Sequence, residues 1–61
     1  MTRSDFEIAA LKAASTLLAQ AAAQAAAGKK GAAGGLARHA VAMLEAAEAS
    51  FLIPFAEDDD E

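Results

Sequence analysis

This 61-residue chain has no cysteine, tryptophan or tyrosine, and it has one proline and one histidine. Without cysteine it can form neither a disulfide nor a thiolate metal site, so neither kind of crosslink can reinforce the fold. A single domain of this size buries little surface and is marginally stable without such reinforcement. The lack of cysteine also leaves the redox compartment undetermined.

Large hydrophobic side chains are scarce, although hydrophobic residues make up 56% of the chain. Twenty of these thirty-four residues are alanine, which leaves fourteen larger ones. Alanine has the highest helix propensity. Burying a methyl-sized group contributes only about 0.8 kcal/mol, however, against roughly 1.5–3 kcal/mol for a leucine or phenylalanine. The composition therefore favours helices that need partners for their stability.

Charge is distributed unevenly along the chain. Residues 1–53 carry five cations and four anions, whereas residues 54–61 carry five anions and no cation. The body is close to neutral and the C-terminal segment is strongly acidic, which gives the net charge of −4. A near-neutral, alanine-rich body offers little electrostatic repulsion against self-association.

The first predicted element is a helix over residues 4–27. Ser4 and Glu7 have the spacing of a capping box, and Gly28 suits the position just after a helix C-terminus. Apolar residues recur on two neighbouring stripes, so the apolar arc is wider than one partner helix can cover. The second stripe beside the main seam consists of Phe6, Ala10, Ala13, Leu17 and Ala21.

The second predicted helix covers residues 36–53, after a glycine-rich turn over residues 28–35. Four glycines in eight residues disfavour helix, and this length suits an antiparallel connection. Pro54 ends the second helix, because the residue before a proline is disfavoured in the helical region. We expect the hairpin core of this helix to be Leu36, Ala40, Met43, Leu44, Ala47 and Phe51.

The fold class that follows is all-α: an antiparallel two-helix hairpin at residues 1–53 with an extended acidic tail at 54–61. The two-striped helices supply more interface than one hairpin can satisfy, so we expect it to pack into a larger helical assembly. The residues expected to contact other copies or a partner are Ile8, Leu11, Leu17, Leu18, Ala22, Ala25, Val41 and Leu52.

Three patterns in the chain are candidate sites of chemistry. A phosphate-binding loop at Gly28-Lys29 would need glycine where Ala23 stands and serine or threonine where Lys30 stands. His39 has no carboxylate or second ligand at helical spacing, and Glu45 and Glu48 form a pair with no matching set on the first helix. We therefore expect no enzyme activity, no cofactor and no metal from this chain alone.

Partners other than protein are also disfavoured. An isoelectric point near 4.7 and a lack of basic clusters beyond Lys29-Lys30 argue against nucleic acid. Residues 8–27 are rich in alanine but poor in leucine, which disfavours a membrane span. Asp5 and Glu7 disfavour a signal peptide. We expect no small-molecule substrate, and we expect the chain in the cytoplasm or within an assembled particle.

Three functions remain open at this point. The leading one is a structural subunit that self-associates or joins a large particle such as a virion, sheath or filament. The second is an adaptor whose tail docks on a basic partner, in which phenylalanine enters a pocket and the acids steer association. The third is a pilin-like hairpin associated with a membrane. The residues expected to dock in the adaptor are Phe55, Glu57, Asp58, Asp59, Asp60 and Glu61.

Overall fold

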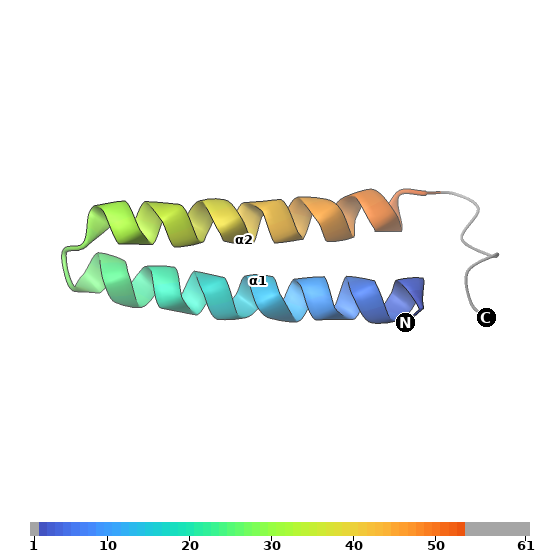
Figure 1. Ribbon diagram of the computed structural model, residues 1–61, viewed down its shortest axis with the longest axis horizontal. Helices are drawn as coiled ribbons and strands as arrows, with labels where there is room; N and C mark the ends of the chain where they lie inside the picture. The colour runs from blue at the N-terminus through green and yellow to red at the C-terminus, as the bar shows by residue number, and fades with distance from the viewer. Residues whose placement is uncertain (1, 54–61) are drawn as a thin grey trace.

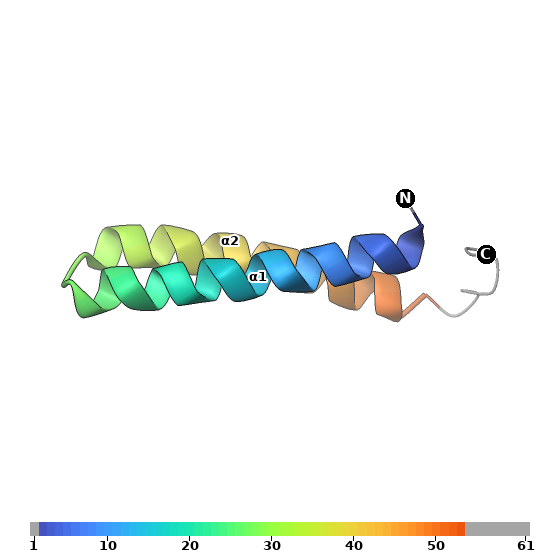
Figure 2. The same ribbon diagram turned by 90° about the horizontal axis from the view of Figure 1, so that it is seen from below.

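The structure is a computed structural model and describes residues 2–53. Two helices, α1 (Arg3–Ala26) and α2 (Lys30–Phe51), pack against each other in an antiparallel hairpin (Figure 1). Seen from below, they cross over each other slightly along their length (Figure 2). At 1.5 Å per residue, the 24 residues of α1 span about 36 Å. The all-helical, two-helix architecture predicted from the sequence is confirmed, with no strand among the described residues.

The first helix begins earlier than predicted. Thr2 is its N-cap: the Thr2 hydroxyl accepts a hydrogen bond from the Asp5 backbone N–H at 3.0 Å, and the Thr2 N–H donates to the Asp5 carboxylate at 3.3 Å. The capping box is therefore Thr2–Asp5, and the predicted Ser4–Glu7 box is wrong. The sequence holds both patterns in overlap. The earlier one lengthens α1 at its start and leaves Glu7 to contact α2.

The turn between the helices is short and depends on one glycine. Gly28 has a φ of +82°, a left-handed conformation that glycine adopts without strain. The Gly28 N–H donates to the Ala25 carbonyl at 3.0 Å, and the Lys29 N–H donates to the Gln24 carbonyl at 2.9 Å. This pair of bonds is a Schellman motif, which satisfies carbonyls that the end of α1 would otherwise leave unpaired.

The predicted turn over residues 28–35 is wrong for most of its length, because α2 begins at Lys30 and includes three of the four glycines. Each of these glycines disfavours helix by about 1 kcal/mol relative to alanine. The packing against α1 offsets that penalty. If α2 began at Leu36, the last turns of α1 would have no partner. Starting at Lys30 gives two helices of 24 and 22 residues that match in length.

Each helix contributes an inner face whose residues recur at alternating steps of three and four, the spacing of an antiparallel coiled coil. The residues of both inner faces are buried or half-buried in the hairpin. On α1 they are Arg3, Glu7, Ala10, Ala14, Leu17, Ala21 and Gln24; on α2 they are Ala33, Leu36, Ala40, Met43, Ala47 and Ser50.

The core of the hairpin is made of alanine. Ala10, Ala14, Ala21, Ala40 and Ala47 are its buried hydrophobic residues, and no large side chain is fully buried in the described residues. Small side chains let helix axes approach toward the lower end of the usual range of about 8–10 Å. The hairpin therefore gains close backbone packing but little buried apolar area.

The predicted core of α2 is wrong at two positions. Leu44 is 38% exposed and Phe51 is 55% exposed, whereas Ala40 and Ala47 are fully buried. Leu36 and Met43 are half-buried. The prediction followed the recurrence of apolar residues on one face of the helix, which includes two neighbouring series. The helices instead pack through the series that contains the small residues, which leaves Leu44 and Phe51 at the side of the seam.

Candidate protein-interaction surface

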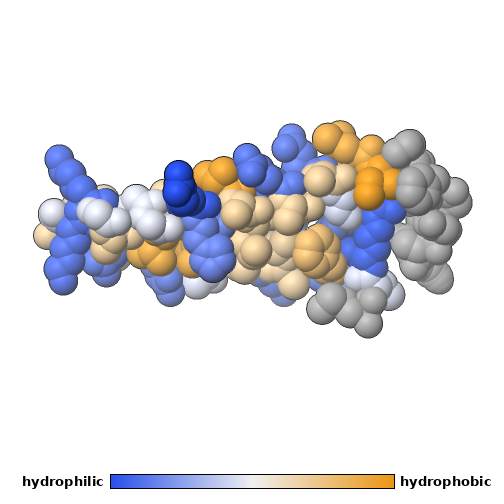
Figure 3. Space-filling view, turned by 45° about the horizontal axis from the view of Figure 1, so that its top comes forward, coloured by the Kyte–Doolittle hydropathy of each residue, from blue (hydrophilic) through white to orange (hydrophobic). Residues whose placement is uncertain are grey.

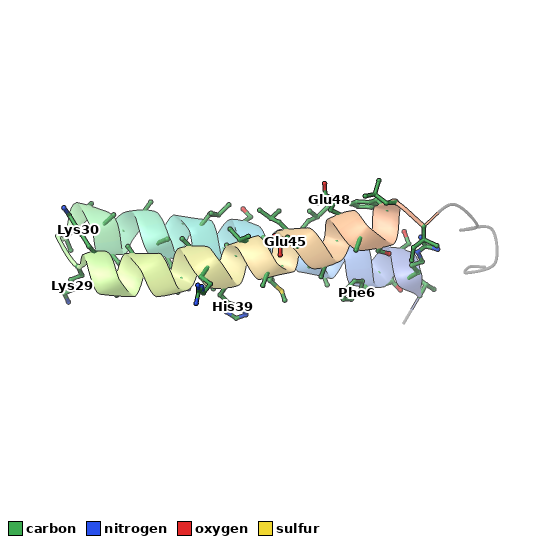
Figure 4. The ribbon with its side chains drawn as sticks, turned by 90° about the horizontal axis from the view of Figure 1, so that it is seen from above. Phe6, Lys29, Lys30, His39, Glu45 and Glu48 are labelled. Carbon is green, nitrogen blue, oxygen red and sulfur yellow. The ribbon has the colours of Figure 1, made fainter. Side chains whose placement is uncertain are left out.

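The inner faces divide the rest of the hairpin into two broad sides. Two antiparallel helices are related by an approximate twofold axis normal to their common plane, so equivalent positions of both helices lie on the same side. The residues that come directly after an inner-face residue in the sequence therefore all lie on one side of the hairpin. The residues that come directly before one all lie on the other side. Phe6 and His39, which both precede, lie on one side of the hairpin, and Glu48, which follows, lies on the other (Figure 4).

The side formed by the residues directly after each inner-face residue carries most of the large apolar side chains. We call this surface the leucine face. Its large residues are between 38% and 55% exposed. From α1 come Ile8, Leu11 and Leu18, and from α2 come Val41, Leu44 and Phe51. These six side chains gather on one side of the hairpin, with Ser15 and Glu48 among them, and the hairpin itself leaves them exposed.

The opposite side, formed by preceding residues, holds mostly small ones, and we call it the alanine face. Its residues are exposed or half-buried, and Phe6 at the open end of the hairpin is a large apolar member. The small side chains of this face are Ala9, Ala13, Ala23, Ala42, Ala46 and Ala49. The hairpin thus has one side rich in large apolar groups and one side of methyl groups.

The open end of the hairpin, where α1 begins and α2 finishes, is closed by a polar cluster. Arg3 Nε donates to Ser50 Oγ at 3.0 Å, and the Ser50 hydroxyl donates to the Glu7 carboxylate. Arg3 Nε also lies 3.5 Å from Glu7 Oε2, with the two side chains only 16% and 12% exposed. Three polar residues therefore occupy inner-face positions and fix the ends of the two helices together.

Arg3 also caps the end of α2. Its Nη2 donates to the backbone carbonyl of Ser50 and, at 3.3 Å, to that of Ile53. Carbonyls at a helix C-terminus lack intrahelical partners, and the helix dipole favours a positive charge there. The sequence reasoning did not single out Arg3 or Ser50. The signal that could have found them is their place in the three-four series of inner positions.

The candidate residues for chemistry point away from one another. Lys29 and Lys30 lie at the turn, His39 and Glu48 lie on opposite sides of α2, and Glu45 lies between them on the outer surface (Figure 4). No group of three potential metal ligands gathers among the described residues. That part of the chain holds no pocket either.

The residues predicted to form an interface are placed in three different ways. Ala22 and Ala25 are exposed and continue the leucine face toward the turn. Leu17 is half-buried on the inner face, so its predicted place on an outer contact surface is corrected to the seam between the helices. Leu52 is 71% exposed and is the C-cap residue that follows α2, so it is not a member of the leucine face. The tail residues from Phe55 to Glu61 lie outside the described residues.

Neither helix in residues 2–53 combines the length and the hydropathy that crossing a membrane requires. Comparison of the chain with protein families, with curated proteins and with solved structures gives no match.

Proposed function

We propose that this chain is a non-enzymatic assembly subunit, whose hairpin associates with further copies of itself through the leucine face. The observation that carries the proposal is the distribution of large apolar side chains. Among residues 2–53, nine of them are at least 37% exposed and six of these lie on one side, while the inner faces bury alanine. A concentration of exposed large apolar side chains on one side of a small protein is typical of an interaction site.

The energetics support association over an isolated hairpin. Five buried alanine methyl groups contribute only about 4 kcal/mol at about 0.8 kcal/mol each. The six side chains of the leucine face are about half exposed, and burying the remainder adds roughly 1 kcal/mol each. In a dimer, twelve such side chains supply about 12 kcal/mol, comparable with the roughly 4–15 kcal/mol that association costs. Association of this strength should depend visibly on concentration.

The geometry of the hairpin fits a four-helix bundle. Two hairpins stacked on their leucine faces place four helices around a shared apolar centre, an architecture that joins antiparallel helices by short loops. The alanine face would remain outside such a dimer. Its small side chains allow close approach of further copies, which is how a larger sheath or filament could grow from the same subunit.

The test of this proposal is sedimentation equilibrium over a wide concentration range, with helicity measured by circular dichroism on the same samples. We expect a defined multimer whose helicity rises with its mass, because the helices depend on contacts between copies. A weakly helical monomer at every concentration would contradict the proposal. It would indicate that a different protein covers the leucine face. Deleting residues 54–61 distinguishes this proposal from the adaptor alternative. If the chain is an adaptor, the deletion abolishes partner binding and leaves the mass of the assembly unchanged.

A further inference from the structure

We infer that two hairpins pair antiparallel on their leucine faces, so that the open end of one copy lies over the turn end of the other. This arrangement rests on the proposed self-association and specifies the partner, a second copy, and its orientation. Three features of the described residues support it: the size of the side chains along the face, the charge at its two ends, and the glycines of α2.

The leucine face is graded in side-chain size from one end to the other. Large residues (Ile8, Leu11, Leu44 and Phe51) occupy the half nearest the open end, and Leu18 and Val41 lie near the middle. In the half nearest the turn, the equivalent positions hold the small residues Ala22, Ala25, Gly34 and Ala37, and Lys30 lies beyond them at the turn. Figure 3 looks onto the opposite side, the alanine face with the outer surface of α2, where strongly hydrophobic atoms also lie toward the end of α2.

This gradient decides between the two ways of stacking the faces. In a parallel pair, bulky halves meet each other and hold the small halves apart, which leaves a gap at the turn ends. In an antiparallel pair, α1 lies over α1 and α2 over α2, and reversal about the middle of the face brings Ile8 of one copy over Ala22 of the other, and Leu44 over Gly34. Bulk then meets small side chains toward both ends of the face, and Leu11 meets Leu18 near its middle, which favours the close packing of protein interiors.

The ends of the hairpin also carry complementary charge. Lys29 and Lys30 lie together at the turn, with Lys30 in a position on the leucine side. Glu48 lies on the leucine side toward the open end, where the start of α1 carries Asp5 and Glu7 against Arg3. A parallel pair would place like charges of both copies beside each other. An antiparallel pair places the lysines of one copy beside the acidic end of the other.

Gly34, one of the three glycines of α2, supports the same arrangement. A Cβ added at Gly34 or Gly35 would meet no atom within 4 Å, so the isolated hairpin has no steric need for glycine there. Each nevertheless lowers helix propensity relative to alanine. Gly34 lies on the leucine face at its turn end, where the bulky half of a second copy would rest in the antiparallel pair. Close contact with that copy gives Gly34 a role that the single hairpin does not.

The orientation can be measured with spin labels, because the chain has no cysteine of its own. Ser4→Cys and Ala25→Cys label exposed positions on the leucine side near the two ends, 21 residues apart and so about 32 Å along α1. We expect dipolar spectroscopy to find labels about 30 Å apart in Ser4→Cys assemblies, as the helix rise requires. Mixed assemblies of the two variants should show a distance clearly shorter than that. A short distance within Ser4→Cys assemblies would overturn the antiparallel arrangement.

Sedimentation of the same labelled samples keeps the two proposals distinguishable. If the samples associate but give the short Ser4→Cys distance, only the orientation is wrong. If they remain monomeric, the proposed function fails and the orientation with it.

A matched pair of substitutions checks the packing independently. Ala22→Leu adds bulk on the small half of the leucine face, and Ala23→Leu adds the same bulk on the alanine face. We expect Ala22→Leu to raise the dissociation constant about tenfold by overpacking, and Ala23→Leu to leave it unchanged. Tighter association of Ala22→Leu would contradict the antiparallel pair, since it would mean that two small halves face each other and the added leucine fills the gap.

Discussion

Two glycine substitutions with opposite expected effects on the free energy of unfolding test the structure of the turn and of the start of α2. Gly35 lies within α2, and a Cβ built on it meets nothing within 4 Å. Gly28 has a φ of +82° at the turn, where a side chain is strained whatever space surrounds it. Gly35→Ala should therefore stabilise the protein, and Gly28→Ala should destabilise it.

The magnitudes follow from the backbone. Alanine in place of glycine inside a helix gains about 1 kcal/mol, because glycine has more conformational freedom to lose on folding. Alanine at the left-handed Gly28 position loses about 1–2 kcal/mol through the contact of its Cβ with the following carbonyl. The difference between the two variants is then about 2–3 kcal/mol, large against the stability of so small a domain.

The assay is urea unfolding followed by circular dichroism, at one protein concentration far above that at which the wild-type assembly dissociates. We expect the unfolding midpoint to rise for Gly35→Ala and to fall for Gly28→Ala, with similar slopes. Position 35 lies on the alanine face, so the substitution does not disturb the leucine face. If Gly35→Ala were neutral or destabilising, α2 would not begin at Lys30, or residue 35 would be in close contact with another copy.

The remaining predictions concern the leucine face, the contact between the two helices and the polar cluster at the open end. The double substitution Leu11→Gln and Leu44→Gln removes the centre of the leucine face and should abolish association in sedimentation equilibrium. The control Thr16→Gln, on the opposite side, should leave association unchanged. Equal loss of association in both variants would contradict the assignment of the face. Ala40→Leu places a large side chain at a position that is 0% exposed between the helices and should destabilise the protein by about 1–3 kcal/mol in urea unfolding, while Ala42→Leu on the alanine face should be tolerated. An unchanged unfolding midpoint for Ala40→Leu would mean that the helices are not in close contact there. Ser50→Ala removes the hydroxyl between Arg3 and Glu7 and should cost about 1–2 kcal/mol of unfolding free energy, because both partners are largely buried. Its control is Ala49→Ser, which adds a hydroxyl at the exposed neighbouring position and should change stability little; equal effects of the two variants would argue against the Arg3–Ser50–Glu7 cluster.

The sequence by itself determined the class of the fold. Alanine-rich segments with strong helix propensity, interrupted by Gly28 and ended before Pro54, give two helices and a reversal between them. The scarcity of large apolar residues also indicated in advance that one hairpin would bury little. These conclusions depend on local propensity and on composition, which are properties of the chain before it packs.

The tertiary structure decided which stripe of each helix faces inward. Both stripes of α1 are apolar, so periodicity alone could not rank them. On α2, the apolar recurrence included Leu44 and Phe51, which the hairpin leaves exposed. The inward series is the one that includes the alanines together with Arg3, Glu7 and Ser50, because these small and polar residues allow close helix contact and join the open end. The larger side chains were then left on one side of the seam.

Packing also decided where α2 begins. Local propensity disfavours helix at Gly31, Gly34 and Gly35, yet all three are helical, because a shorter α2 would leave the end of α1 without a partner. Propensity differs by about 1 kcal/mol per glycine. Contacts along a whole helix exceed that difference and are made only when the second helix is present. A sequence reports the local preference, and only the folded hairpin shows which preferences its packing overrides.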